Sequence, residues 1–216
     1  MPKNFPSWRT CRRRLIEWEE QGVLIAVHQH RIALLDEQGK LRLDETFLDG
    51  TFVPAKKRGE CVGKTKAGKG SMIMVASDAK GVPLNTVVAS ASTYEGHLAE
   101  KTIDGIQAKK HGTRHKHPKR LIPKRVVADK GYDDDKLRGR FAERGIDCIV
   151  PYRDNRVNRP FEDLRKLRRY KRRWKVERTN AWLKNFRRVT IRWDRNLSVY
   201  KGCVHIACVC ITLMKF

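Results

Sequence analysis

The sequence predicts a mixed α/β fold in which helices flank a central sheet. Three strand patterns, over residues 41–53, 71–77 and 83–91, follow one another and predict an antiparallel start to the sheet. Helical patterns then alternate with short apolar strands at 126–129 and 146–151, which predicts a mixed sheet. The length of 216 residues and the hydrophobic content of 40% suit one domain with a short appendage.

The appendage lies at the N-terminal end of the sequence. Residues 7–35 predict one or two helices, because apolar residues recur through them and Gly22 makes a break. We therefore divide the chain into an N-terminal helical segment, 1–40, and an α/β domain, 41–216. On the first strand of that domain odd-numbered residues share one face, so Asp49 should point to the same side as Phe47 and Val53.

The remaining segments are predicted from turn residues and apolar spacing. We expect a basic, glycine-rich hairpin loop at 56–70, and a turn at Asp78-Ala-Lys-Gly81. Four helices are expected after this turn: over 97–110, over 133–144, from Pro160 onward, and over 197–214. One of the first aspartates of the second helix should be its N-cap, and Pro160 suits the first turn of the long third helix.

Charge is the strongest compositional signal. The chain has 48 Lys and Arg against 24 Asp and Glu, which gives a net charge of +24. Residues 165–195 hold 14 basic and two acidic residues, so half of the net charge falls on one short segment. This concentration favours a polyanionic partner, nucleic acid first, over a merely solubilising surface.

Cysteine and histidine do not indicate a disulfide framework or a soft-metal site. The six cysteines form no CxxC pair, and three of them lie in the apolar run 204–214 or just before it, where free cysteine behaves as a small hydrophobe. His111, His115 and His117 lie in a basic loop expected at 109–125, where contact with solvent or DNA is favoured over a metal site. The apolar run is shorter than the roughly 20 residues that span a bilayer, and no signal-peptide pattern opens the chain. A reducing cytoplasm is the expected location.

One carboxylate near the C-terminal end has unusual neighbours. Tyr170, Arg173, Glu177 and Lys184 project within roughly 60° of arc if the segment is one α-helix at about 100° per residue. Arg and Lys bind phosphate, which suits a glutamate that holds a metal ion beside a DNA backbone. Apolar spacing predicts the packing face of the same helix, formed by Leu164, Leu167, Trp174, Trp182, Phe186 and Val189.

This spacing, Tyr-x2-Arg-x3-Glu-x6-Lys, resembles the signature of bacterial insertion-sequence transposases of the DDE type, and the likeness is greatest for the insertion sequence 5 group. Two further segments resemble the other acidic motifs of that family: Leu48-Asp49-Gly-Thr-Phe-Val53 and Val126-Val-Ala-Asp129-Lys-Gly-Tyr132-Asp133. The resemblance runs from about Leu43 to the C-terminus. It implies a ribonuclease H-like fold for 41–216, with Asp49, Asp129 and Glu177 as catalytic metal ligands.

The resemblance also implies the cofactor and the partners. Two Mg²⁺ ions, which Mn²⁺ can replace, would hold the scissile phosphate, and oxygen ligands suit such hard ions. Tyr170, Arg173 and Lys184 would contact the DNA backbone. The DNA would comprise the terminal inverted repeats and the target, bound by a homodimer at the bacterial nucleoid, with no membrane partner.

Several carboxylates compete with the three motif residues. Asp44 should face away from Asp49 and lie on the surface, and Glu45 shares the face of Asp49 but lies about 13 Å along the strand. Asp78 suits a turn, and Asp133 to Asp135 suit a helix N-terminus.

Two alternatives to a working transposase stay open. Members of the family normally carry a longer region before the segment that resembles Pro2 to Pro6, so we expect an N-terminally truncated chain whose segment 1–40 is the remnant of a DNA-binding region. Such a chain would keep the three carboxylates but bind the element's ends more weakly. A truncated DNA-binding remnant without catalysis is the first alternative. A general nuclease of the same fold is the other alternative.

Overall fold

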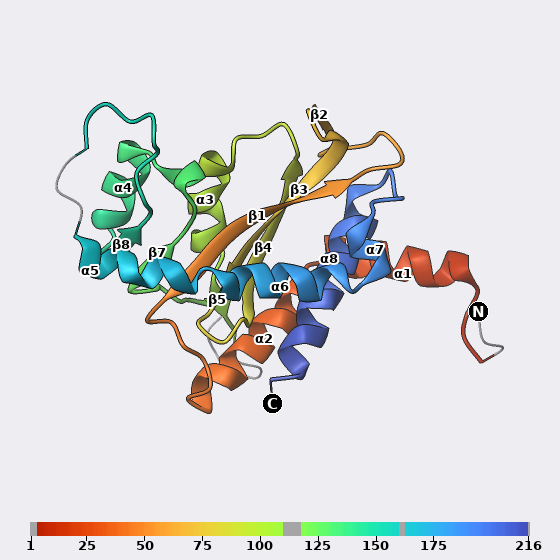
Figure 1. Ribbon diagram of the computed structural model, residues 1–216. Helices are drawn as coiled ribbons and strands as arrows, with labels where there is room; N and C mark the ends of the chain where they lie inside the picture. Colours follow the sequence, from red (N-terminus) through yellow and green to blue (C-terminus); the bar gives the residue numbers. More distant parts are fainter. Residues whose placement is uncertain (1–3, 110–117, 160–162, 216) are drawn as a thin grey trace.

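The structure is a computed structural model that describes residues 4–109, 118–159 and 163–215. It confirms the predicted α/β class, since helices lie on both sides of a mixed sheet (Figure 1). The strands run in the order β2 (Gly63–Thr65), β3 (Gly68–Ser77), β1 (Thr46–Pro54), β7 (Arg125–Val127) and β8 (Asp147–Ile149). Strand β4 (Pro83–Ser90) also pairs with β3, on the edge that holds β2 and not on the edge that holds β1. The expected histidine loop falls mostly on residues 110–117, so His111, His115 and His117 lie outside the described residues.

Two helices, α1 (Trp8–Glu20) and α2 (Val23–Glu37), form the N-terminal segment, as predicted. The Ser7 side chain caps α1 by accepting a hydrogen bond from the Thr10 amide. Gly22 separates the helices with a φ of 71°, a left-handed conformation that glycine adopts without strain. Both helices pack against α8 (Leu197–Leu213), while the start of α1 extends away from the sheet (Figure 1).

An antiparallel meander opens the sheet. It comprises β1 (Thr46–Pro54), β3 (Gly68–Ser77) and β4 (Pro83–Ser90), and the short strand β2 (Gly63–Thr65) makes a hairpin with the start of β3. The Asp78 carboxylate holds the turn between β3 and β4, because it accepts hydrogen bonds from the amides of Lys80 and Val82. The turn prediction for Asp78 is therefore confirmed.

Two short parallel strands extend the sheet on the other side of β1. They are β7 (Arg125–Val127) and β8 (Asp147–Ile149), joined by the 3₁₀ turn η1 (Lys130–Tyr132) and helix α4 (Asp135–Ala142). Asp134 is the N-cap of α4 and accepts from two backbone amides, as the sequence indicated for one of the three aspartates.

The helix expected over 97–110 was placed wrongly. Helix α3 runs from Glu95 to Asp104 and ends at Gly105, and β5 (Gln107–Ala108) then pairs with β6 (Lys119–Arg120). A separate two-stranded sheet thus replaces the last helical turn and part of the expected loop. Pairing of Ala108 with Lys119 and of Gln107 with Arg120, 11 and 13 positions later, overrides the local helical pattern.

Two hydrophobic cores cover the two faces of the sheet. Leu48 and Met74 face α2, α3 and α4, whereas Phe47, Val53 and Val75 face α6 (Trp174–Lys184) and α8. Asp49 has the same parity as Phe47 and Val53, so its side chain belongs to the α6 face, as predicted.

The long helix expected from Pro160 is interrupted. Its first residues, 160–162, lie outside the described residues, and the rest divides into α5 (Leu164–Leu167), the 3₁₀ segment η2 (Arg168–Arg172) and α6 (Trp174–Lys184). These segments run end to end across one side of the sheet in Figure 1. A 3₁₀ helix has three residues per turn, so Arg169 and Arg172 align and both reach the buried Glu45 carboxylate. A single 3.6-residue period would not align this pair as closely.

The packing face of this segment also differs from the prediction. Leu164 and Trp174 are 72% and 50% exposed, and Val176 and Leu183 are the buried apolar residues of α6. Trp182, Phe186 and Val189 do pack in the core, the last of them from α7 (Arg187–Thr190). The break in helical period rotates Leu164 relative to α6, which explains its exposure. Trp174, at the start of α6, lies under the Arg178 guanidinium rather than in the core.

No helix in the described part of the chain is long and apolar enough to cross a membrane.

Candidate active site

The three motif carboxylates come from three elements that meet on one side of the sheet. Asp49 lies in the middle of β1, Asp129 follows β7, and Glu177 lies in the first turn of α6. Phe47 pairs with Val127 in the parallel register of β1 and β7, and Asp49 and Asp129 each follow that pair by two residues. Adjacent parallel strands therefore bring these two aspartates side by side.

Arg173 joins two of the carboxylates. One guanidinium nitrogen, Nη1, lies 3.4 Å from Oδ1 of Asp49, and the other, Nη2, donates to Oε1 of Glu177 at 2.5 Å. Burial would lower the pKa of Arg173, but the charges of Asp49, Asp129 and Glu177 raise it overall. The guanidinium thus supplies positive charge at the point where the acidic side chains converge.

Tyr170 joins the third carboxylate to the same segment. Its hydroxyl donates to Oδ1 of Asp129 at 3.0 Å, and this oxygen also accepts from the Lys130 amide at 2.6 Å. Burial, followed by the hydrogen bond to Asp129, raises the pKa of Tyr170. Tyr170 and Arg173 are three residues apart at the 3₁₀ turn, so both point into the site.

Asp49 is more buried than Glu177, with 18% of its side chain exposed against 51%. Burial raises the pKa of Asp49 to about 6; Arg173 opposes this shift, and the charges of Glu95, Asp129 and Glu177 add to it. A nearby cation would stabilise the ionised form of this carboxylate and so lower its pKa.

The sequence prediction missed one residue that contacts Asp49 and one that lies against the other face of β1 at the next residue. Nδ2 of Asn180 donates to Oδ2 of Asp49 at 2.9 Å, and Oδ1 of Asn180 is buried without a hydrogen bond among the described residues. Glu95, the first residue of α3, places its carboxylate against Gly50. Asn180 lies three residues after Glu177 on α6, so helical spacing from the motif glutamate was the signal that could have found it.

The competing carboxylates do not join this site. Asp44 is exposed and pairs with Lys124, as expected for a surface acid. Glu45 is buried, but Arg169 and Arg172 neutralise it. Asp133 accepts from Arg138 and Arg156. The Asp78 carboxylate accepts hydrogen bonds from backbone amides of its own turn.

Lys184 is the one residue of the Tyr-Arg-Glu-Lys motif whose side chain does not contact the three carboxylates among the described residues. It is the last residue of α6, two turns after Glu177, and it is exposed. Among the described residues its ammonium group makes no hydrogen bond or ion pair.

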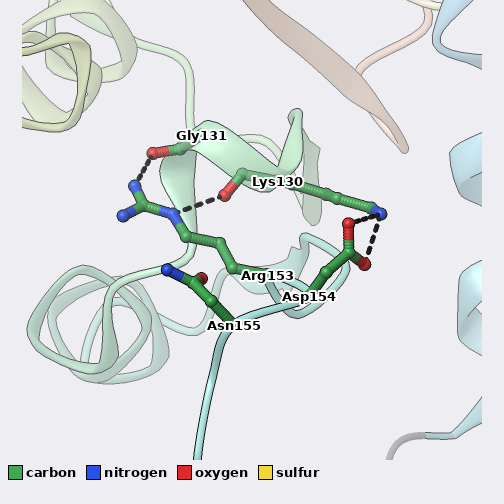
Figure 2. Close-up of a pocket in the computed structure, with 5 residues that line it drawn as sticks. All are labelled: Lys130, Gly131, Arg153, Asp154 and Asn155. Atoms are coloured by element: carbon green, nitrogen blue, oxygen red, sulfur yellow. Dashed lines mark hydrogen bonds and ion pairs between the residues drawn. The ribbon is translucent and has the colours of Figure 1, made fainter.

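An open pocket of about 420 Å³ adjoins Asp129. Its lining comprises Lys130, Gly131, Arg153, Asp154 and Asn155 (Figure 2). Nε of Arg153 donates to the Lys130 carbonyl and Nη2 to that of Gly131, while Nζ of Lys130 pairs with Asp154. These contacts hold a basic rim beside the carboxylates.

The chemistry of the site fits a divalent metal ion. All its donors are oxygens, which Mg²⁺ prefers, and Asn180 adds a buried oxygen without a partner. Among the described residues, however, no three Asp, Glu, His or Cys side chains are close enough to form a metal site. Arg173 lies between Asp49 and Glu177 and occupies the space between their carboxylates.

Comparison with known proteins identifies the family. Residues 41–212 match the family model described as Transposase DDE domain. The chain belongs to this family. The transposase DDE domain covers the whole sheet and every element that contributes to the carboxylate site.

Relatives of this transposase domain include two proteins named as insertion sequence transposases. The transposase for element IS402 of Burkholderia cepacia is 33% identical over 146 residues, which are 68% of this chain and 64% of that protein. The transposase for element IS6501 of Brucella ovis is 28% identical over 138 residues, 63% of this chain and 92% of the relative. This chain therefore spans less than two thirds of the first relative. The expected insertion sequence 5 group stays a prediction.

The fold has a solved counterpart. The piggyBac transposase in its synaptic complex with hairpin DNA superimposes with a TM-score of 0.54 at 9% identity, over 80% of this chain and 46% of that chain. This likeness confirms the predicted ribonuclease H-like fold of the transposase domain.

Proposed function

We propose that this chain is a DNA transposase that cleaves strands at the ends of a mobile element and joins the resulting 3′-hydroxyl to target DNA. One observation carries the proposal: Asp49, Asp129 and Glu177, distant in sequence, converge with Tyr170 and Arg173 within a transposase DDE domain. The net charge of +24 supports a polyanionic substrate. The substrates are then the terminal inverted repeats and the target DNA.

The proposal includes Mg²⁺ as the cofactor, with Mn²⁺ as a substitute. Asp49, Asp129 and Glu177 are the residues that would hold two such ions. Bound there, the ions would activate a water molecule and stabilise the charge that develops on the phosphate. Burial is the main cause of the raised pKa of Asp49, and a bound cation would stabilise its ionised form, which supports a metal ligand at this position.

The other residues of the site have roles toward DNA in this proposal. Arg173 compensates the carboxylates in the metal-free protein and turns its guanidinium fork to a phosphate once their charge is neutralised. Tyr170 orients Asp129 through its hydroxyl. Lys184 contacts the backbone of the DNA as a point charge.

In this proposal residues 41–216 carry out catalysis and the helical segment 1–40 contacts DNA. Synapsis of two DNA ends would require a homodimer, acting at the bacterial nucleoid. A DNA-binding protein without catalysis is the second candidate function.

The test compares carboxylate variants in a cleavage and strand-transfer assay with Mg²⁺ or Mn²⁺ and DNA that carries the element's ends. Asp129→Ala and Asp49→Asn should abolish cleavage and leave salt-sensitive DNA binding nearly unchanged. Asp44→Asn is the matched control, because Asp44 is exposed and pairs with Lys124, and it should cleave normally.

Each alternative has its own result. Metal-dependent cleavage retained by Asp129→Ala would contradict the catalytic assignment. Strong binding without cleavage by the unaltered chain would establish the remnant. Cleavage of arbitrary DNA without strand joining would indicate a general nuclease.

A further inference from the structure

The open pocket beside Asp129 is lined by groups to which neither the motif spacing nor the family match assigns a role. They come from the turn that follows Asp129 and from the loop that follows β8. The Lys130 amide donates to Oδ1 of Asp129 at 2.6 Å, so the pocket begins one residue from this carboxylate. Strands β7 and β8 are parallel neighbours, and ligands of open α/β sheets bind outside the carboxyl ends of such strands.

Arg153 supplies this pocket with a cation whose position is fixed before any ligand binds. Its Nε donates to the Lys130 carbonyl at 3.1 Å, and its Nη2 donates to the Gly131 carbonyl at 2.5 Å and to the Tyr94 hydroxyl at 2.8 Å. These three acceptors are neutral. Within the described residues Arg153 forms no ion pair, and its Nη1 makes no hydrogen bond. The guanidinium therefore offers an uncompensated charge and a free donor.

A buried carboxylate anchors the loop that carries Arg153. Oδ2 of Asp133 accepts from the Arg153 amide at 2.9 Å, and its Oδ1 accepts from Arg138 at 3.0 Å and from Arg156 at 2.8 Å. The Asp133 side chain is only 2% exposed, and these two arginines compensate its charge. The loop is thus held by its backbone and by Arg156, which leaves the Arg153 guanidinium available to a ligand.

Lys130 supplies a second cation, and its partner is easily displaced. Nζ of Lys130 lies 2.8 and 3.1 Å from the two carboxylate oxygens of Asp154. The Asp154 side chain is 88% exposed and that of Lys130 is 45% exposed, so water screens the pair. An anion that brings its own negative charge to Lys130 can therefore replace Asp154 at small cost.

The arrangement of the two cations indicates the kind of ligand. Figure 2 shows the Lys130 and Arg153 side chains extending in opposite directions from the pocket. Cations placed apart in this way suit successive phosphates of one strand, because every nucleotide of a DNA strand carries one negative charge. Asn155, whose side chain makes no hydrogen bond among the described residues, adds an amide of the kind that also contacts phosphate oxygens.

We propose that this pocket binds the backbone of the DNA strand next to the scissile phosphate, with Lys130 and Arg153 each contacting one phosphate. Asp154 competes with the DNA for Lys130. This inference rests on the proposed function, which supplies the DNA and places the cut at the motif carboxylates.

The experiment measures binding of labelled DNA that carries the element's ends to the full chain, by fluorescence anisotropy without divalent metal. Single methylphosphonate linkages, which lack the phosphate charge, replace the phosphates around the cleavage site one at a time. One linkage should weaken binding of the unaltered chain about tenfold and have no further effect on Arg153→Gln. A nearby linkage should show the same relation to Lys130→Gln.

The coupling between residue and linkage distinguishes a phosphate contact from a structural role. If Arg153→Gln and Lys130→Gln only disturbed the loop, both would lower the affinity but stay fully sensitive to every linkage, and the proposal would be overturned. It would also be overturned if no linkage weakened binding of the unaltered chain. Arg120→Gln is the control, because Arg120 pairs with Asp104 at the other end of α3 and should stay sensitive to every linkage.

Asp154→Asn gives a test of opposite sign. It releases Lys130 and should strengthen DNA binding more than Glu143→Gln, which removes the same charge from an exposed residue at the end of α4. Damage to the fold would not strengthen binding. Equal affinities of the two variants would overturn the competition between Asp154 and DNA.

Binding and cleavage together separate this inference from the function on which it rests. If the unaltered chain shows these couplings but does not cut DNA with Mg²⁺ or Mn²⁺, the proposed catalysis fails and the pocket assignment stands. If the chain cuts and joins DNA while every linkage effect persists in Lys130→Gln and Arg153→Gln, only the pocket assignment fails.

Discussion

The Tyr170 hydroxyl donates a hydrogen bond to the Asp129 carboxylate, although the two residues are 41 positions apart in the sequence. The bond attaches the segment that carries Glu177 to the end of β7. It therefore sets the distance between two of the acidic motifs. The single-helix geometry inferred from the sequence did not contain this contact, because it lies between elements.

Removing this hydroxyl should slow catalysis and weaken folding. A hydrogen bond to a charged acceptor contributes about 1.5–3 kcal/mol to stability, and a loss of about 1.4 kcal/mol of transition-state stabilisation corresponds to about tenfold in rate. Tyr170→Phe should therefore cleave DNA roughly tenfold more slowly and have a lower melting temperature than the unaltered chain. Single-turnover cleavage measures this effect, and an unchanged rate would show that Tyr170 does not orient Asp129.

Lys184 should contribute to DNA affinity alone. Its exposed ammonium group has no partner among the described residues, so it is available to a phosphate. Lys184→Ala should weaken DNA binding uniformly across sequences and reduce the salt dependence of log K by about one unit. Lys136→Ala, which removes an exposed lysine on α4, is the control. Equal salt slopes for the two variants would remove Lys184 from the DNA interface.

Glu45 should stabilise the segment that positions Tyr170 and Arg173, and the two sides of its ion pairs should respond unequally. The Glu45 side chain is only 4% exposed, whereas those of Arg169 and Arg172 are 36% and 43% exposed. Glu45→Gln releases two arginines that can turn to solvent, and should cost about 1–2 kcal/mol of unfolding free energy. Arg169→Ala with Arg172→Ala leaves a buried carboxylate unpaired, and should cost about 3 kcal/mol or more.

Urea denaturation of these variants gives the comparison. Asp44→Asn breaks an exposed pair one residue away and should change the unfolding free energy by less than about 1 kcal/mol. If the double arginine variant were no less stable than Glu45→Gln, burial of Glu45 would not govern this contact.

His28 should make stability depend on pH. Burial, and then the nearby charge of His205, lower the pKa of His28 from 6.5 to about 4, while its hydrogen bond to the Pro83 carbonyl opposes the shift. The unfolded chain takes up a proton below pH 6.5 and the folded chain does not until about pH 4, so this contribution to stability is complete above 6.5 and is lost as the pH falls toward 4.

The same linkage sets the magnitude of this effect. Between pH 7.5 and 5 the unaltered chain should lose about 2 kcal/mol more unfolding free energy than His28→Gln, which does not titrate. Chemical denaturation at the two pH values checks this. A pH dependence shared by both proteins would assign it to other groups.

How far the sequence predicted this protein can be judged from particular elements. The α1–α2 pair, the turn at Asp78 and the face of β1 that carries Asp49 were predicted correctly, because glycine, turn aspartate and strand alternation act over a few neighbouring residues. The transposase family was also identified from motif spacing. The roles of the motif residues stay predictions until the variants are measured.

The sequence by itself determined the family, the fold class and the candidate carboxylates, because the residue types and their spacing along the chain carry that information. Only the tertiary structure decided which groups surround Asp49. Arg173 and Asn180 reach it from the N-cap and the middle of α6 through packing of that helix against the sheet, and a 3₁₀ turn that no local pattern marks aligns Arg169 and Arg172 on Glu45. Contacts between residues more than 40 positions apart depend on how the helices pack against the sheet, and local spacing does not encode that packing.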